Sequence, residues 1–292
     1  MGFGSSSASI SDARAGTGAP KYAAGVGTPR PMPTDISRII SDAAYQAYER
    51  RLLAQVRAGV VPHHVAIIMD GNRRFAVELG LGNPAQGHEK GRDKLEEVLQ
   101  WCLDIGVRIL TVYAFSTENL TRPTEEIREL MRLFAENFRR VGDDERVHRH
   151  KIRVQVFGDR DLLPADVKEA IAYAEGRTKD YDHYRFNLAV AYGGREEILD
   201  AIRDVVREAQ EGRVKPEEID EKFFSKRLYT ADLPDPDLVL RTSGEERISN
   251  FLLWQLAYSE LYFVDVYWPG FRKIDFLRAI RSYQQRQRRY GA

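Results

Sequence analysis

Disulfide bonds, a net charge and long apolar runs are what this sequence lacks. Its 292 residues include one cysteine, Cys102, which excludes an intrachain disulfide and a cysteine-based zinc cluster and fits a reducing compartment. Lys and Arg number 44, as do Asp and Glu, so no overall field attracts nucleic acid, and any recognition of anions must be local. Because no apolar run approaches the ~20 residues that cross a bilayer, we expect a cytoplasmic chain.

The first 34 residues differ in composition from the rest of the chain. They are rich in Gly, Ala, Ser and Pro and poor in large apolar side chains, so burial could not offset the entropy of ordering them. They also lack the basic start and the apolar stretch of a signal peptide. We therefore predict a flexible leader over residues 1–34 and one catalytic domain over residues 35–292.

Beyond this leader, two hydrophobic patterns alternate. Short runs rich in β-branched residues predict buried strands over residues 64–69, 108–114, 152–157, 186–191 and 238–240. Apolar residues three and four positions apart predict helices over residues 36–58, 95–103, 123–141, 164–177 and 195–210. Alternation of this kind is typical of an α/β fold with a mostly parallel central sheet flanked by helices. In such sheets ligands bind beyond the carboxyl ends of the strands.

The first predicted strand ends in a polar turn, Asp70-Gly71-Asn72-Arg73-Arg74-Phe75. Backbone amides at a helix start, with two arginines beside them, form a ready anion site. A carboxylate such as Asp70 would repel a phosphate there unless a hard divalent cation, such as Mg²⁺, bridged the two. Alternatively, Asp70 caps the helix or pairs with one of the arginines, and these six residues leave both readings open.

Four further polar residues or segments are candidate parts of a site. His88 stands between two glycines, where a ligand could approach closely, although a lone histidine is more often structural. Residues 114–123 are polar and could serve a site or simply start the next helix. Residues 241–250 place two arginines and two serines around a glycine, which makes a second plausible phosphate cradle. Glu260 lies among aromatic residues and needs a cation or a hydrogen-bond partner.

Two anion cradles and one metal ion beside apolar helices would suit two phosphorylated substrates, as a prenyl condensation requires. The sequence contains HVAIIMDGNRRF, GH..G, YAFSTEN..RP, RTSGE.RISNFLLWQ and AYSELYF..V.WP in this order. These motifs resemble those of the cis-prenyltransferases, the undecaprenyl diphosphate synthase family, from about Pro62 to Gly291, and in detail they are most similar to archaeal members. The resemblance implies repeated condensation of isopentenyl diphosphate onto an allylic diphosphate, either geranylgeranyl or farnesyl diphosphate. The product would be a long-chain Z-polyprenyl diphosphate of undecaprenyl type.

The resemblance also implies an apolar tunnel, Mg²⁺, a homodimer and transient contact with a membrane surface. We expect helices 95–103 and 126–141 and strand 152–157 to form the tunnel walls. By position, Asp70 and Glu260 would hold the metal, while Asp70, Asn72 and Asn119 would be catalytic. The isopentenyl diphosphate cradle would comprise Arg241, Arg247 and Ser249, and Arg289 and Gly291 would reach the partner subunit's site. The other substrate-binding residues would be Gly71, Asn72, Arg73, Arg74, Phe75, His88, Phe115, Ser116, Thr117, Glu118, Leu120 and Arg122.

Three features depart from many bacterial members of that family. Arg73-Arg74-Phe75 replaces Gly-Arg-Trp, no arginine occurs within residues 81–86, and Leu120 stands where an aromatic residue is common. Together with Thr117, the Arg-Arg-Phe form is similar to archaeal or eukaryotic members, which makes geranylgeranyl diphosphate a plausible starter beside farnesyl diphosphate.

Two other functions stay open. A non-catalytic subunit of a prenyltransferase complex typically loses the aspartate and the arginines, which this chain retains. A metal-dependent phosphohydrolase would need a second aspartate near Asp70. A trans-type synthase is disfavoured, because residues 143–147 read Asp-Asp-Glu-Arg-Val and form no Asp-Asp-x-x-Asp motif.

Overall fold

The computed structural model describes residues 35–286, so the predicted leader lies outside the described residues, as do Arg289 and Gly291. The chain divides into two units, residues 1–45 and 46–292. The boundary falls within helix α1 (Asp35–Ala58). Among the described residues, no helix is both long and apolar enough to span a membrane.

A parallel sheet forms the centre of the second unit. Within its described part the strands are β1 (His64–Ile68), β2 (Ile109–Ser116), β3 (Ile152–Phe157), β4 (Tyr184–Tyr192), β5 (Leu238–Arg241) and β6 (Glu260–Phe263). Their order is β3-β4-β2-β1-β5-β6, and every neighbouring pair is parallel. The predicted α/β class is thus confirmed. Five strands were predicted, whereas the four half-buried residues of edge strand β6 were missed.

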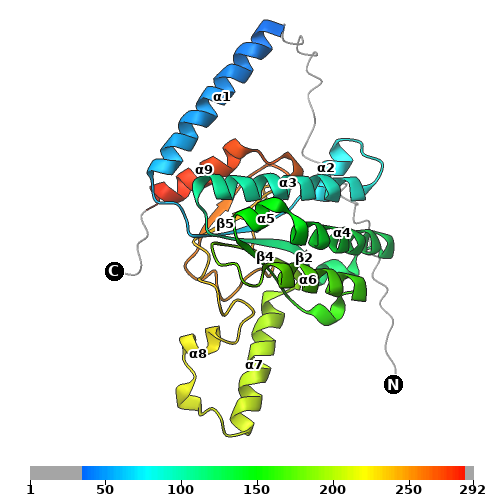
Figure 1. Ribbon diagram of the computed structural model, residues 1–292, viewed down its shortest axis with the longest axis vertical. Coiled ribbons are helices and arrows are strands. Elements are labelled where there is room, and N and C mark those ends of the chain that lie inside the picture. Colours follow the sequence, from blue (N-terminus) through cyan, green and yellow to red (C-terminus); the bar gives the residue numbers. More distant parts are fainter. Residues whose placement is uncertain (1–34, 287–292) are drawn as a thin grey trace, which may run out of the picture. The chain divides into compact units, whose positions relative to one another are not determined.

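Helices cover the sheet and connect its strands. They are α2 (Asn72–Glu78), α3 (Pro84–Ile105), α4 (Thr124–Asp143), α5 (Glu145–Arg149), α6 (Ala165–Thr178), α7 (Gly194–Gln210), α8 (Glu221–Ser225) and α9 (Lys273–Gln285), with short 3-10 turns at η1 (Thr117–Thr121), η2 (Arg160–Leu162), η3 (Pro216–Glu218) and η4 (Trp268–Gly270). Each of the predicted helices has a counterpart. Figure 1 shows α3, α4, α5 and α6 gathered together, while α7 and α8 extend away from the sheet.

The start and end of α3 follow from local chemistry. Asn83 caps the helix, because its side chain accepts a hydrogen bond of 2.9 Å from the Ala85 N–H, and Pro84 occupies the first helical position. Gly106 ends it in a left-handed conformation at φ 86°. These two signals set where α3 begins and where it ends.

Alternate residues of the strands pack on opposite faces of the sheet. One face is filled by a dense cluster rich in aromatic residues: Ala66, Ile68, Tyr113, Phe157, Ala189, Tyr192, Val239, Phe251 and Leu252. On the same face as Ala66, His64 contacts the Thr111 hydroxyl at 2.7 Å, and the Asn187 amide donates to that hydroxyl at 3.1 Å. Burial lowers the pKa of His64 to about 4, so its ring is neutral and its Nδ1–H donates to the Pro234 carbonyl at 2.7 Å. On this face of the sheet, the strands are therefore joined both by apolar packing and by hydrogen bonds between side chains.

Candidate active site

A cleft of about 1350 Å³ opens at the carboxyl ends of β1, β2 and β5. The turns after these strands and the start of α7 line it. Of the residues predicted for the site, the cleft is lined by Asp70, Gly71, Asn72, Arg73, Arg74, His88, Phe115, Ser116, Glu118, Asn119, Arg122, Arg241 and Ser249. The structure thus brings together residues that lie up to 179 positions apart in the sequence, because parallel strands end at the same edge of the sheet.

The turn between β1 and α2 directs Asp70 into this cleft. Gly71 has a φ of 106°, and a Cβ atom there would lie 2.7 Å from the Tyr267 ring, so only glycine fits without strain. The Thr242 hydroxyl accepts a hydrogen bond from the Asp70 N–H at 2.9 Å and donates to the Asp70 carbonyl at 2.7 Å. The Trp268 N–H donates to the same carbonyl at 2.9 Å. The backbone of Asp70 is therefore fixed by three hydrogen bonds, two with Thr242 and one with Trp268.

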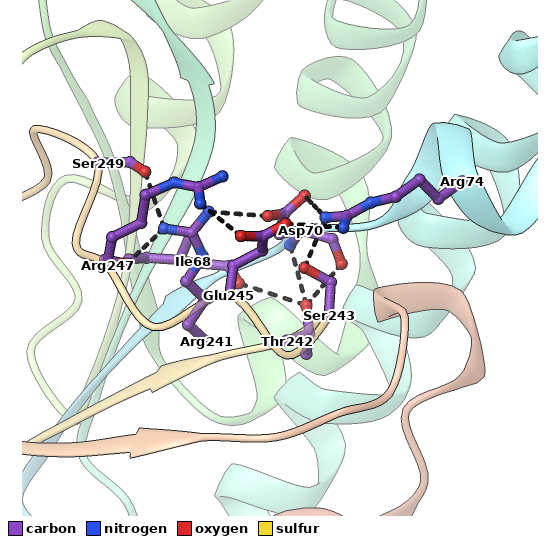
Figure 2. Close-up of polar contacts among 9 residues, drawn as sticks. All are labelled: Ile68, Asp70, Arg74, Arg241, Thr242, Ser243, Glu245, Arg247 and Ser249. Atoms are coloured by element: carbon purple, nitrogen blue, oxygen red, sulfur yellow. Dashed lines mark hydrogen bonds and ion pairs between the residues drawn. The ribbon is translucent and has the colours of Figure 1, made fainter. Parts of the chain in front are cut away.

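The Asp70 carboxylate lies between two arginines, as Figure 2 shows. Arg74 donates to Oδ1 at 3.0 Å and Arg241 to Oδ2 at 2.8 Å. Burial raises the pKa of Asp70, but hydrogen bonds from Arg241, Ser243 and Arg74 outweigh it, so the pKa falls below its ordinary value and the group stays ionised. Of the alternatives left open above, pairing with Arg74 is present, whereas no side chain caps α2.

The donor chemistry around Asp70 fits a hard divalent cation that also binds phosphate oxygens. Mg²⁺ typically takes one or two carboxylates and completes its shell with water and substrate phosphates. Asp70 is ionised and 26% exposed in the cleft, so it can supply one such ligand. Among residues 35–286, no group of three or more His, Cys, Asp and Glu side chains is placed to hold a metal by itself. Asp70 would therefore need oxygens from a bound substrate.

Arg241 joins the two predicted cradles. Its side chain is 4% exposed, and Nη1 donates to the Ser249 hydroxyl at 2.8 Å and to the Arg247 carbonyl, while Nη2 binds Asp70. Its buried Nε has no partner in the structure. The Arg247 side chain does not line the cleft, because it pairs with Glu245, which also pairs with Arg74 at 3.0 Å. An anion at either cradle would thus change the electrostatics of the other.

The loop after β5 holds strained backbone beside the second cradle. Ser243, Ser249, Asn250 and Leu252 have φ values of 78°, 47°, 62° and 46°, in the left-handed region that non-glycine residues avoid. Asn250 explains how this conformation persists. Its side-chain amide donates to Glu118 and Glu196, each at 3.1 Å, and its Oδ1 accepts from the Arg195 N–H at 2.9 Å. Strain of this kind is typical of sites whose geometry the surrounding fold imposes.

Glu126 is a site residue that the sequence interpretation missed. It accepts hydrogen bonds from Arg122 at 3.1 Å and His88 at 3.3 Å and pairs with Arg73 at 3.6 Å, and its side chain is only 10% exposed. Burial lowers the pKa of His88, while the Glu126 hydrogen bond raises it, and the net effect is a lowered pKa. His88 is therefore neutral near pH 7. The four-residue spacing of Arg122 and Glu126 could have revealed that one pair.

Arg195 was also missed. It lines the cleft from the first turn of α7, directly after the two glycines that follow β4. Arg195 follows the end of a predicted strand, and this position could have identified it, because the other cleft residues were predicted from their positions after strands.

Within one chain, Glu260 lies too far from Asp70 to bind the same metal ion, which corrects the prediction that the two residues share a metal site. It is the first residue of β6 and lies in register with Leu238, the first residue of β5. Asp70, in contrast, follows the carboxyl end of β1, so the two carboxylates lie towards opposite ends of the sheet. Glu260 instead pairs with Arg286 at 2.5 Å. The register of β6, which the sequence pattern does not reveal, is the reason. Phe75, Thr117 and Leu120 also lie outside the cleft lining.

A second cavity, of about 140 Å³, lies next to the cleft between α3, α4 and the sheet, and we call it the apolar channel. Its apolar walls come from α3, α4 and β4, among them Leu99, Phe134 and Leu188. The cavities are neighbours, because five residues line both of them: Met69, Asn72, His88, Ala114 and Leu130. The buried Oδ1 of Asn72 has no hydrogen-bond partner at this junction.

The helical walls of the channel were predicted correctly, but the strand was not. No residue of β3 lines the channel, whereas Phe186 and Leu188 of β4 do. The strand order is the cause, because β4 lies next to β2 and β3 is the outer edge of the sheet.

Known proteins are similar to this chain in sequence and in fold. The family model described as "Putative undecaprenyl diphosphate synthase" matches residues 68–291. The chain is 58% identical over 254 residues to a protein of Methanopyrus kandleri named tritrans,polycis-undecaprenyl-diphosphate synthase (geranylgeranyl-diphosphate specific), covering 87% of this chain and 93% of that one. It is 56% identical over 256 residues to the protein of the same name from Thermococcus kodakarensis, covering 88% and 97%.

Two solved structures are also similar to this chain in fold. A lavandulyl diphosphate synthase from Lavandula x intermedia, in complex with dimethylallyl diphosphate, is 38% identical with a TM-score of 0.76, covering 80% of this chain and 99% of that one. A protein from Campylobacter jejuni described as a probable undecaprenyl diphosphate synthase is 30% identical with a TM-score of 0.65, covering 79% and 99%.

Proposed function

Because the chain belongs to the undecaprenyl diphosphate synthase family of cis-prenyltransferases, we propose that it condenses isopentenyl diphosphate repeatedly onto geranylgeranyl diphosphate. The product would be a Z-polyprenyl diphosphate of undecaprenyl length, a precursor of a glycosyl carrier lipid. The observation that carries this proposal is one cleft, lined by arginines after two strands, that lies directly beside an apolar channel. The names of the archaeal relatives support the geranylgeranyl starter over farnesyl diphosphate.

The cradles explain how this chain would promote the reaction. When the allylic C–O bond breaks, negative charge grows on the departing diphosphate. Arg73, Arg74 and Arg241 line the cleft and are already oriented by Glu126 and Asp70, so little reorganisation is needed as the charge develops. The second cradle, with Arg241 and Ser249, would hold isopentenyl diphosphate beside it.

We assign Asp70 to Mg²⁺ binding together with substrate oxygens. When bound, the ion would neutralise charge on the departing diphosphate. Both Asp70 oxygens are held by arginines, so one ion pair must open when the ligands bind. The Thr242 and Trp268 contacts would keep the carboxylate in place during that exchange.

The apolar channel would receive the growing chain. Burying hydrocarbon is worth roughly 0.8 kcal/mol per CH₂ group, so each added five-carbon unit favours continued binding as long as space remains. Asn72 and His88 stand at the junction, where the reacting end of the chain would lie.

A homodimer is the second part of the proposal. Leu199, Ile202 and Val206 recur at three- and four-residue steps on α7 and are 49%, 44% and 49% exposed. An exposed apolar stripe on a helix suits burial against a second copy of the chain. Arg289 and Gly291 stay predicted contributors to the partner subunit's site. The long product would bring the enzyme into transient contact with a membrane surface, and we expect no nucleic acid partner.

The test is an assay of the purified chain alone with radiolabelled isopentenyl diphosphate. Dimethylallyl, geranyl, farnesyl and geranylgeranyl diphosphates serve as starters, each with Mg²⁺ or with EDTA, and mass spectrometry measures product length. We expect the highest kcat/KM with geranylgeranyl diphosphate and no product with EDTA. Release of inorganic phosphate without chain growth would indicate a phosphohydrolase. Activity only after addition of another subunit would indicate a non-catalytic member of a complex.

A further inference from the structure

Asn250 joins three turns of the chain, each of which follows a different strand. It lies after β5, and its side-chain amide donates to Glu118 of η1, after β2, and to Glu196 of α7, after β4, each at 3.1 Å. All three residues line the cleft. One side chain therefore links the turns that form this edge of the sheet.

Asn250 also caps the start of α7 from outside that helix. Its carbonyl accepts a hydrogen bond of 2.7 Å from the Gly194 N–H, and its Oδ1 accepts one of 2.9 Å from the Arg195 N–H. The first amides of a helix have no partner within it, and the N-cap residue, Gly193, supplies no side-chain hydrogen bond. A Cβ atom on Gly193 would lie 2.7 Å from the Asn250 amide nitrogen, so glycine leaves room for the contact. The start of α7, and with it the backbone of Arg195, is thus fixed against Asn250.

The residue before Asn250 belongs to the second cradle. This residue, Ser249, accepts a hydrogen bond from Arg241 at 2.8 Å through its hydroxyl, as Figure 2 shows. Ser249 and Asn250 have φ values of 47° and 62°, so two consecutive residues occupy a conformation that non-glycine residues avoid. The hydrogen bonds of Asn250 oppose this preference and keep the Ser249 hydroxyl beside Arg241.

The Arg195 side chain is exposed and lines the cleft. Within residues 35–286, its guanidinium forms no hydrogen bond or ion pair, whereas Arg241 is bound to Asp70. A guanidinium without a carboxylate partner can bind a diphosphate without first losing an ion pair. Arg195 is therefore suited to an anion held next to Ser249.

We propose that Asn250 is a positioning residue for isopentenyl diphosphate, which acts by holding Ser249 and Arg195 in place to bind the diphosphate of this substrate. The inference rests on the proposed function and adds Asn250 and Arg195 to the second cradle. A displacement of about 1 Å in a positioned group can lower a rate roughly 10²-fold, so loss of the Asn250 contacts is measurable by kinetics.

The first cradle is held by other contacts. Arg73 pairs with Glu126 at 3.6 Å, and Arg74 pairs with Asp70 at 3.0 Å. Loss of the Asn250 side chain should therefore raise the KM for isopentenyl diphosphate, while kcat and the KM for the allylic starter change little.

The decisive variant is Asn250→Gly. Glycine adopts a φ of 62° without strain, so this variant keeps the backbone conformation accessible and removes only the side chain. If asparagine stood there merely because it tolerates the left-handed conformation, glycine would replace it without loss. We expect instead that the KM for isopentenyl diphosphate rises roughly 10- to 100-fold in initial-rate measurements with geranylgeranyl diphosphate.

A double-mutant cycle tests whether Asn250 acts through Arg195. Arg195→Ala should also raise the KM for isopentenyl diphosphate. Combined with Asn250→Gly, it should raise that KM by less than the product of the two single effects, because residues that act together are not additive. Arg203→Ala is the matched control, since Arg203 also lies on α7 but pairs with Asp200 and does not line the cleft.

Asn83→Ala is the control for loss of stability. Asn83 is another asparagine that caps a helix, α3, and it does not line the cleft. Its replacement should lower the melting temperature and leave the KM for both substrates unchanged.

An unchanged KM for isopentenyl diphosphate in Asn250→Gly, or equal increases for both substrates, would overturn the role of Asn250 and leave the proposed function standing. Failure of the wild-type chain to condense any starter would instead remove the proposed function. If circular dichroism shows that Asn250→Gly does not fold, the same measurement on Asn250→Asp decides, because aspartate keeps the side-chain length and loses the donors to Glu118 and Glu196.

Discussion

Two charged clusters line the two neighbouring cavities, and they are held in different ways. The cluster of Asp70, Arg74 and Arg241 lines the cleft at the ends of strands, and its central Arg241 is 4% exposed. The second cluster lines the apolar channel, lies on helices or at their ends, and is largely half-exposed; we call it the distal lattice, and it comprises Glu96, Arg140, Asp144 and Arg146. Removing one partner of a buried ion pair costs about 3–5 kcal/mol, whereas an exposed pair contributes about 0–1 kcal/mol. The charges that line the cleft are thus held firmly, whereas those that line the apolar channel are held weakly.

The largest effect is expected from Asp70→Ala. The substitution removes the proposed metal ligand and leaves Arg241 without its charged partner. Loss of a preorganised electrostatic contact lowers turnover by ~10²–10³, and we expect at least that loss at saturating Mg²⁺. Steady-state rates give the effect, and Asp70→Asn, which keeps the side-chain shape, is the control for folding. Turnover near that of the wild type would contradict the metal role and the contrast between the two clusters.

A smaller and more selective effect is expected from Arg247→Ala. Arg247 is a predicted member of the second cradle. Its side chain pairs with Glu245 in the structure, and we expect its guanidinium to bind the isopentenyl diphosphate instead when that substrate is present. A hydrogen bond to a charged group contributes about 1.5–3 kcal/mol, so the KM for isopentenyl diphosphate should rise roughly 10- to 100-fold. The KM for the allylic starter should change less. Equal losses for both substrates in initial-rate measurements would show that the two cradles are not separate.

Glu126→Gln tests whether charges near the cleft are coupled through buried contacts. The Glu126 carboxylate favours the protonated form of His88, so its removal should lower the pKa of His88 further. NMR titration of the His88 ring measures this pKa, and the protonated form should appear at a lower pH than in the wild type. Glu96→Gln, at the distal lattice, should leave the titration unchanged. A His88 titration that moves to higher pH in Glu126→Gln would contradict the contacts described here.

The smallest effect is expected for stability at the distal lattice. Because its ion pairs are half-exposed, Glu96→Gln should change the free energy of unfolding by about 0–1 kcal/mol. Thermal and urea unfolding followed by circular dichroism measure this change. A loss of several kcal/mol would mean that the lattice is a structural brace and would remove the contrast with the cleft cluster.

Much of the fold could be predicted from local patterns. The strands of the sheet centre are continuous apolar runs because both of their faces are covered, and β1 is buried along its whole length. Strand β6 was missed because its residues Glu260–Phe263 are few and half-buried at the edge, so its pattern is weak. The order of the strands decided which one lines the channel, and no local pattern carries that order.

The site was predictable where one motif follows one strand. Asp70 and Arg241 were found in this way, and the structure places them 2.8 Å apart. Glu126 could not be found by that reasoning, because it serves the site through three partners from separate segments. The prediction for Glu260 was wrong for a different reason. Its motif was recognised, but the register of β6 against β5 places Glu260 at the end of the sheet away from Asp70.

The left-handed residues after β5 have a consequence for engineering. Glycine at Ser243 would relieve the backbone there, since a non-glycine residue costs roughly 1–2 kcal/mol in that conformation. Leu252 does not offer the same gain, because its side chain is buried in the aromatic cluster and glycine there would leave a cavity. Glycine at Ser243 would also let the loop sample wider backbone angles and hold Ser249 less accurately. A more stable variant selected at Ser243 should therefore lose substrate affinity, so heat resistance and tight binding of the second diphosphate are competing design goals in this loop.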